Sequence, residues 1–204
     1  MGIKNLGALV FAGALTLTAG CNHKGGIDQN AQYKDALNNY YAAHPACLWE
    51  HTKKFPVQAA TADDAKTQGY DALTDAGLLV RTTAEKKQFL IGSKQVNNYD
   101  LSPQGRSDWT VDPAQPGYGN FCYARREVTS MDNASQTTNS SGQKTAVVNY
   151  HFKLTHIAGW AQSPEMKTAF PRLASVGTGS EPGQTTLVWN GAVWQMSTQS
   201  AGVQ

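Results

Sequence analysis

The chain has 204 residues, with 17 Lys and Arg against 15 Asp and Glu and a formal net charge of +2. This nearly balanced charge argues against a partner that is held by strong electrostatic attraction. The length is enough for one well-buried domain or two small ones, and we expect one.

The first 20 residues have the pattern of a secretory signal peptide. Lys4 supplies a positive charge, and an apolar run follows at residues 6–17. A helix needs about 20 apolar residues to cross a bilayer, so this run is too short to be a membrane span. We therefore predict that residues 1–20 are a cleaved targeting segment.

The segment ends in Leu17-Thr18-Ala19-Gly20-Cys21. This stretch resembles a lipobox, the cleavage motif of bacterial lipoproteins, although Thr18 occupies the position where the family most often has leucine. The resemblance implies cleavage before Cys21 and acylation of that cysteine, which would anchor the protein because each buried methylene contributes about 0.8 kcal/mol. The alternative is an ordinary signal peptide that is cleaved near Ala19 and leaves Cys21 as a free thiol.

The lipoprotein resemblance also implies a location and a domain plan. Asn22 follows the cysteine, whereas aspartate commonly marks retention in the inner membrane, so we expect the periplasmic face of the outer membrane. Residues 21–31 would be the lipidated cysteine and a polar linker, and residues 32–204 would be a single α+β domain. The expected partners are the membrane, through the lipid, and an envelope protein or glycan.

The two remaining cysteines, Cys47 and Cys122, form an even pair in a chain that is expected to be exported to an oxidising compartment. We predict that they form a disulfide, with two separate buried thiols as the alternative. Neither cysteine has the CxxC or HxxxH spacing that is typical of a metal site.

The first half predicts two helices and three short strands. Residues 29–43 carry Tyr33, Leu37 and Tyr40 at helical spacing, and Pro45 ends that helix. A second helix begins at Thr61, which can cap the first turn, and ends at Gly77. Residues 78–83, 87–92 and 95–101 then read as short strands.

The stretch from Ala72-Leu73-Thr74-Asp75-Ala76-Gly77 to Ser102-Pro103-Gln104-Gly105-Arg106 resembles the recognition helix and wing of winged-helix proteins. That family binds DNA, which normally requires a basic surface. Here the helix has Lys66 against Asp71 and Asp75, and an exported protein meets no chromosome. We read the likeness as a shared scaffold and expect no nucleic-acid partner.

The second half is rich in strands. Residues 121–130 and 145–155 read as strands that flank a polar loop at residues 132–143. A short helix is expected after Ser163-Pro164-Glu165. Residues 185–189 and 192–196 are predicted to form a hairpin around a two-residue turn at Asn190-Gly191.

Together these elements predict an α+β fold. N-terminal helices and a winged-helix-like helix-hairpin unit would be followed by an antiparallel sheet with a short covering helix.

The sequence contains no recognisable catalytic or cofactor motif. GxSxG is absent, and the glycines at 177, 179 and 183 lack the lysine of a phosphate-binding loop, so we read them as a flexible surface loop. Asp63-Asp64 reads as a helix start. The histidines at 44, 51, 151 and 156 are not paired at metal-ligand spacing, so we expect neither a metal nor a cofactor.

The aromatic residues give a weaker indication of binding. Their rings could line a groove for a glycan or a peptide, or could belong to the core: Trp109, Trp160, Trp189, Trp194, Tyr118 and Tyr123. We predict a binding or scaffold module of the cell envelope that is not an enzyme. The alternative is an enzyme that acts on envelope material such as peptidoglycan, with a site assembled from dispersed residues.

Overall fold

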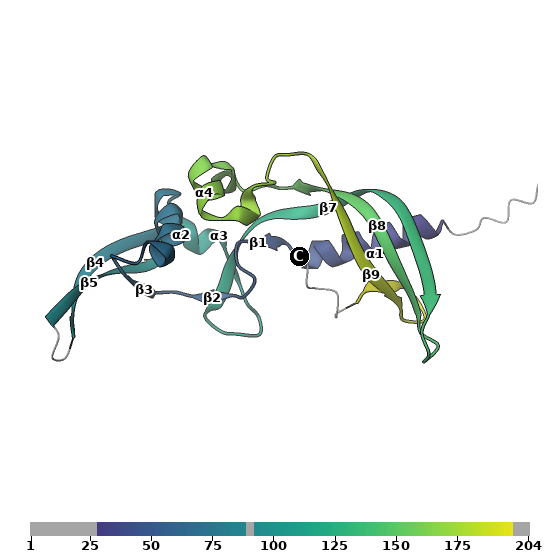
Figure 1. The fold of residues 1–204 in the computed structure, drawn as a ribbon, viewed down its shortest axis with the longest axis horizontal. Coiled ribbons are helices and arrows are strands. Elements are labelled where there is room, and N and C mark those ends of the chain that lie inside the picture. The colour runs from purple at the N-terminus through teal and green to yellow at the C-terminus, as the bar shows by residue number, and fades with distance from the viewer. Residues whose placement is uncertain (1–27, 89–91, 198–204) are drawn as a thin grey trace, which may run out of the picture.

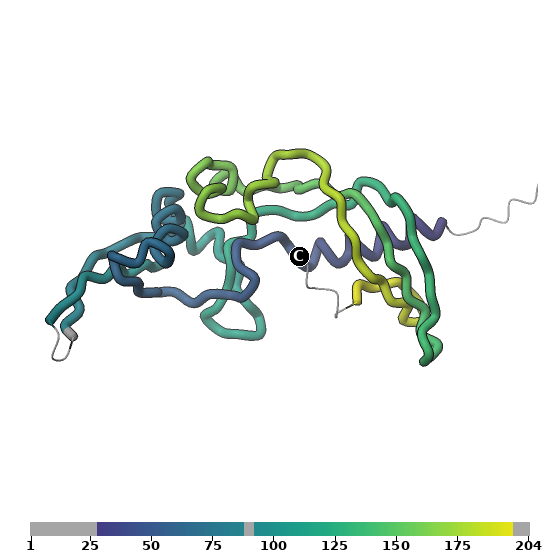
Figure 2. Tube along the Cα trace, in the orientation of Figure 1, coloured from purple at the N-terminus to yellow at the C-terminus, as the bar shows by residue number. Residues whose placement is uncertain are grey.

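The computed structural model describes residues 28–88 and 92–197. The fold is mixed α+β, with two antiparallel sheets that lie toward opposite ends of an elongated molecule (Figure 1). The β4–β5 hairpin projects at one end, and the long β7–β8 hairpin curves away at the other (Figure 2). The predicted α+β class is therefore confirmed at the level of overall architecture.

The larger sheet has seven strands and is built around one very long strand, β7. The order is β1-β7-β8-β9-β10, and β2 and β6 also pair with β7. The strands are β1 (Ala46–Cys47), β2 (Lys53–Lys54), β6 (Trp109–Val111), β7 (Tyr118–Thr138), β8 (Lys144–Thr155), β9 (Ser180–Trp189) and β10 (Trp194–Met196).

Helix α1 (Gln29–Ala43) runs along the concave side of this sheet (Figure 1). Its bounds match the prediction, and its first turn is capped by Asp28, whose carboxylate accepts from the N–H of Asn30 at 3.0 Å. Tyr33, Leu37 and Tyr41 follow one another at helical spacing and are buried against the sheet. They belong to a core cluster with Val128, Val148, Tyr150 and Leu187.

The smaller sheet has the order β3-β5-β4, formed by β3 (Val57–Ala60), β4 (Leu79–Gln88) and β5 (Gly92–Leu101). Helix α2 (Asp64–Asp75) lies between β3 and β4 in the chain, and α3 (Pro103–Asp108) follows β5. Ser102 connects α3 to the turn that follows α2. Its hydroxyl donates to the carbonyl of Gly77 at 2.6 Å and accepts from the N–H of Gly105 at 2.8 Å.

A second core cluster joins the smaller sheet to the proximal part of β7. Its fully buried members include Leu73, Leu78, Tyr99 and Phe121. Helix α4 (Pro164–Ala169) covers this cluster with Met166, and Ser163 caps it as the sequence predicted. The short 3-10 turns η1 (Gly159–Gln162) and η2 (Pro171–Leu173) flank α4.

The first half differs from the prediction in several places, and β2, α3 and β6 were not predicted at all. Helix α2 begins at Asp64, because Asp63 caps it while the Thr61 hydroxyl donates to the carbonyl of Gln95. Two long strands, β4 and β5, replace the three short strands. Strand β3 was missed, since its four residues have no clear alternation and are held by pairing with β5.

The polar loop predicted at residues 132–143 is wrong in extent. Strand β7 continues to Thr138, and only residues 139–143 connect it to β8. Side chains join the two strands across this stretch: Asn149 donates to Asn133 at 2.6 Å, and the hydroxyls of Thr137 and Thr145 lie 2.8 Å apart. Such cross-strand pairs stabilise a polar hairpin that composition alone marks as a loop.

The hairpin at Asn190-Gly191 is present, but its turn is longer than predicted. Trp189 pairs with Trp194, so four residues form the connection and β10 begins two residues late. The side chain of Asn190 accepts from the N–H groups of Ala192 and Val193 at 3.0 and 2.9 Å. Gly191 has a φ of 100°, which favours glycine.

The predicted signal segment, Cys21 and most of the predicted linker lie outside the described residues. Helix α1 begins at Gln29, within the range that was expected to be linker. Among residues 28–88 and 92–197, no helix combines the length and apolar character that a bilayer span requires.

Candidate functional site

A groove lies between α1 and the β9–β10 hairpin, with a volume of about 560 Å³. We call it the α1–β10 groove. Six residues of or next to α1 form one wall: Gln32, Asp35, Ala36, Asn39, Tyr40 and His44. The other wall comes from the hairpin: Trp189, Ala192, Val193, Trp194, Gln195 and Met196.

Helical geometry explains why α1 offers both a buried face and a groove face. Tyr33, Leu37 and Tyr41 point into the core, so the residues beside them on the helix, such as Ala36 and Tyr40, lie at its margin. Tyr40 is half-buried and Asn39 is exposed. The first wall therefore combines the rings of Tyr40 and His44 with amide and carboxylate side chains.

Two contacts between aromatic rings hold the hairpin wall in place. The ring of Trp194 is 6% exposed and packs edge-on against Tyr33, with ring centroids 5.1 Å apart. Trp189 lies 5.5 Å from Trp194 between ring centroids and stays half-buried. Val193 at the loop is 54% exposed. The groove is thus open to solvent, and the two tryptophan rings of its hairpin wall are held by packing on each other and on Tyr33.

His44 is stacked on Tyr40, with ring centroids 3.9 Å apart and planes 10° from parallel. Its Nδ1 lies 2.8 Å from the backbone carbonyl of Tyr40. A carbonyl can only accept, so Nδ1 carries the proton, and Nε2 of the neutral ring is an acceptor. This arrangement presents one hydrogen-bonding nitrogen at the end of the groove.

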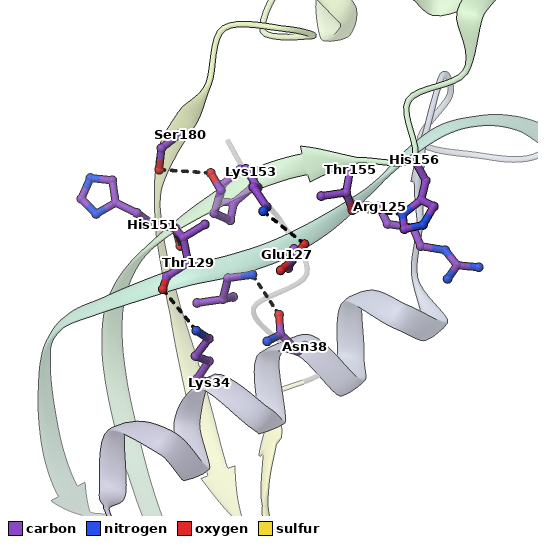
Figure 3. Close-up of polar contacts among 12 residues, drawn as sticks. Lys34, Asn38, Arg125, Glu127, Thr129, His151, Lys153, Thr155, His156 and Ser180 are labelled. Carbon is purple, nitrogen blue, oxygen red and sulfur yellow. Dashed lines mark hydrogen bonds and ion pairs between the residues drawn. The ribbon is translucent and has the colours of Figure 1, made fainter.

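The sheet holds α1 through polar contacts at an irregularity in β7 (Figure 3). The register of β7 shifts between Val128 and Ser130, as in a β-bulge. Asn38 accepts from the N–H of Val128 at 2.9 Å, and Lys34 donates to the carbonyl of Thr129 at 3.2 Å. These bonds set the position of α1, and with it one wall of the groove.

Behind α1, the hydroxyls of Tyr41 and Tyr150 lie 2.5 Å apart in the core. Burial raises the pKa of Tyr150, and the hydrogen bond with Tyr41 raises it further. Gly183 of β9 lies directly against the Tyr150 ring, where an added Cβ would be 2.5 Å from Cζ. Gly183 is therefore a strand residue in close contact with a ring, which corrects its assignment to a flexible loop.

The structure brings Cys47 and Cys122 together, as the sequence predicted. They are register partners in β1 and β7, and their sulfur atoms lie 2.06 Å apart. This disulfide joins β1, which follows α1, to the long strand β7.

The predicted aromatic residues do not form one exposed patch. Tyr123 is buried, and Trp109 and Trp160 pack on Phe121 at 4.9 and 6.1 Å between ring centroids. Tyr118 lies under Lys54, whose Nζ is 5.8 Å from the ring centroid. Trp189 and Trp194 alone among the six line the α1–β10 groove.

The histidines are scattered. His151 pairs with Asp132, with 3.0 Å between Nδ1 and Oδ2, and His156 contacts Thr155. His51 is exposed. Asp63 caps α2 and forms an ion pair with Lys66 at 2.7 Å, which fits the predicted helix start. In the described part of the chain, no three His, Cys, Asp or Glu side chains are grouped as metal ligands.

The sequence contained part of the signal for the groove. Tyr40 and His44 share a helical face, and two tryptophans flank the Asn190-Gly191 turn. Nothing in the sequence indicated that these two elements face each other, because about 145 residues separate them along the chain.

A scan against protein-family models, a search of curated proteins and a search of solved structures find no match to this chain.

Proposed function

We propose that this chain is a lipid-anchored protein of the bacterial cell envelope that binds another envelope component through the α1–β10 groove. The observation that carries the binding role is the groove itself, where the half-buried rings of Tyr40 and Trp189 lie beside amide side chains. Open aromatic surface bordered by polar groups is typical of binding sites. The cellular location rests on the lipobox-like sequence that ends at Cys21.

The anchor is tested by a Cys21→Ser variant. Wild-type protein should sediment with membranes and the variant should appear in the soluble periplasmic fraction, because it has no acylated thiol. A variant that still sediments with membranes would contradict the anchor. An Asn22→Asp variant tests the second expectation, since it should move the protein from the outer to the inner membrane.

The groove is tested by cross-linking in intact envelopes. A photoreactive residue replaces Val193, which is 54% exposed at the groove. The control carries the same residue at Val111, which is 69% exposed and outside the groove. A discrete adduct from position 193 and not from 111 supports binding. Equal patterns from both positions would contradict it.

The smaller sheet supports a further part of the proposal. We infer that α2 and the β4–β5 hairpin form a winged-helix-like scaffold without a role in DNA binding. Lys66 pairs with Asp63, and Arg81 pairs with Asp71 at 2.6 Å, so acidic partners offset these cations. Salt-sensitive binding of duplex DNA by the purified protein would contradict this assignment.

The enzyme alternative stays a hypothesis. Incubation of the protein with purified peptidoglycan distinguishes it, because an enzyme would release soluble fragments and a binding module would only sediment with the polymer.

A further inference from the structure

We propose that the ligand of the α1–β10 groove is a neutral glycan chain. This inference rests on the proposed binding function and adds the chemical class of the ligand. Four kinds of observation support it: the mixed chemistry of the groove walls, their charge, the shortness of β10, and the contacts that hold the walls in place.

The groove walls match the two surfaces of a sugar ring. A pyranose has C–H groups on its faces and hydroxyl groups around its rim. Trp189 offers a half-buried aromatic ring for such a face, which gains from burial of apolar area, and Tyr40, one face of which is covered by His44, offers a second ring. Gln32, Asn39 and Gln195 offer amides, which both donate and accept, to the hydroxyls.

The charge of the walls argues against an anionic ligand. Among the described residues that line the groove, Asp35 is the one carboxylate and none is Lys or Arg. A phosphate or a nucleic acid would meet a negative charge without a compensating cation. A simple acyl chain would use none of the hydrogen-bonding groups that these side chains offer.

An extended peptide is a less suitable occupant. Peptides commonly bind beside a sheet by adding a strand to an open edge. The available edge here is β10, which has three residues and pairs with β9 within the described sheet. A strand this short offers few backbone groups, and short edge strands are a known protection against such pairing.

The groove is held in shape before any ligand binds. Tyr33 braces Trp194, Asn190 holds the loop through two backbone hydrogen bonds, and Tyr40 orients His44. A preformed site lowers the entropic cost of binding, because fewer side chains become ordered when the ligand binds. Its volume of about 560 Å³ lies within the roughly 300–1,000 Å³ of typical ligand sites.

The test is a titration of the full-length protein, purified in detergent, with soluble oligomers of N-acetylglucosamine and of glucose. Calorimetry and tryptophan fluorescence should show saturable binding of at least one series. Trp189→Ala should weaken that binding by about tenfold or more, as loss of a central aromatic contact does. Asn39→Ala, an exposed change that leaves the core intact, should weaken it by a smaller factor.

Tyr118→Ala is the matched control, because it removes a half-buried ring outside the groove. It should bind the oligomer with wild-type affinity, and circular dichroism should show that all three variants are folded. Absence of saturable binding by the wild-type protein would overturn the glycan inference. Binding that both Trp189→Ala and Asn39→Ala leave unchanged would also overturn it.

A second arm separates this inference from the proposed function. If neutral synthetic peptides bind in a manner that depends on Trp189 while the oligomers do not, the ligand class is wrong and the binding role of the groove stands. If the oligomers do not bind and the position 193 cross-link also gives no specific adduct, both proposals fail.

Discussion

The side-chain carbonyl of Asn38 on α1 accepts a hydrogen bond from the backbone N–H of Val128, 90 residues away in β7, at 2.9 Å. Val128 is 1% exposed, so water has little access to its N–H group while Asn38 is in place. The register of β7 shifts directly after Val128. A helix side chain therefore satisfies an N–H group at a bulge, and the same bond positions one wall of the groove.

Asn38→Ala should lower the free energy of unfolding by about 1–3 kcal/mol, the cost of a buried donor without an acceptor. Asn39→Ala is the control. The side chain of Asn39, the next residue along α1, is exposed, and replacing Asn by Ala has the same effect on helix propensity at both positions. Urea unfolding of both variants measures the difference. Equal stabilities would show that the bond to Val128 contributes nothing.

Replacement of both Cys47 and Cys122 by serine should lower the free energy of unfolding by about 4 kcal/mol in the chain-entropy model, because the bond closes a loop between residues 75 apart. Reduction of the wild-type protein should have the same effect. Mass spectrometry of the unreduced protein should find the two peptides joined. Alkylation of both cysteines without prior reduction would contradict the pairing.

Gly105→Ala should destabilise the protein by about 1–3 kcal/mol or more, since an added Cβ would lie 1.9 Å from the carbonyl oxygen of Leu78. That oxygen belongs to the backbone and cannot move independently. Gly159→Ala is the control, because nothing lies within 4 Å of the added atom. Thermal unfolding compares the two, and a Gly105→Ala protein as stable as its control would contradict the close packing of α3.

Alkaline pH should destabilise the fold through its buried tyrosines. Burial raises the pKa of five of them: Tyr33, Tyr70, Tyr99, Tyr123 and Tyr150. In the unfolded chain these phenols ionise near pH 10, whereas in the folded protein they stay neutral. The unfolded state therefore binds fewer protons above about pH 10, and stability falls as pH rises from there.

Urea unfolding at a series of pH values around 10 measures this decline, and phenolate absorbance of the native protein follows the ionisation itself. Tyr150→Phe should make the decline shallower, because one of the shifted groups is gone. Ionisation of all eight tyrosines near pH 10 in the folded protein would contradict the prediction.

Local patterns in the sequence predicted the elements whose stability is local. Helix α1 has its predicted bounds, with Asp28 as cap and an apolar face at helical spacing. Helix α4 begins at Pro164 after the Ser163 cap. In both cases the residues that specify the element lie within it or beside it.

Elements that depend on distant partners were missed or placed inaccurately. The distal part of β7 has the composition of a loop, yet pairing with β8 makes it a strand. Strand β3 exists because β5 lies beside it. Their stability comes from hydrogen bonds and side-chain pairs across strands, which a single segment does not encode by itself.

The same distinction holds for the candidate site. The residues alone were enough to predict the mixed α+β class, the helix that carries Tyr40 and the pairing of Cys47 with Cys122, which the structure contains. Only the tertiary structure placed α1 against the β9–β10 hairpin, so that Tyr40 and Trp189 line one groove. A groove between distant elements depends on how the sheet curves around the helix. Packing of the core and contacts such as the bond between Asn38 and Val128 fix that curvature.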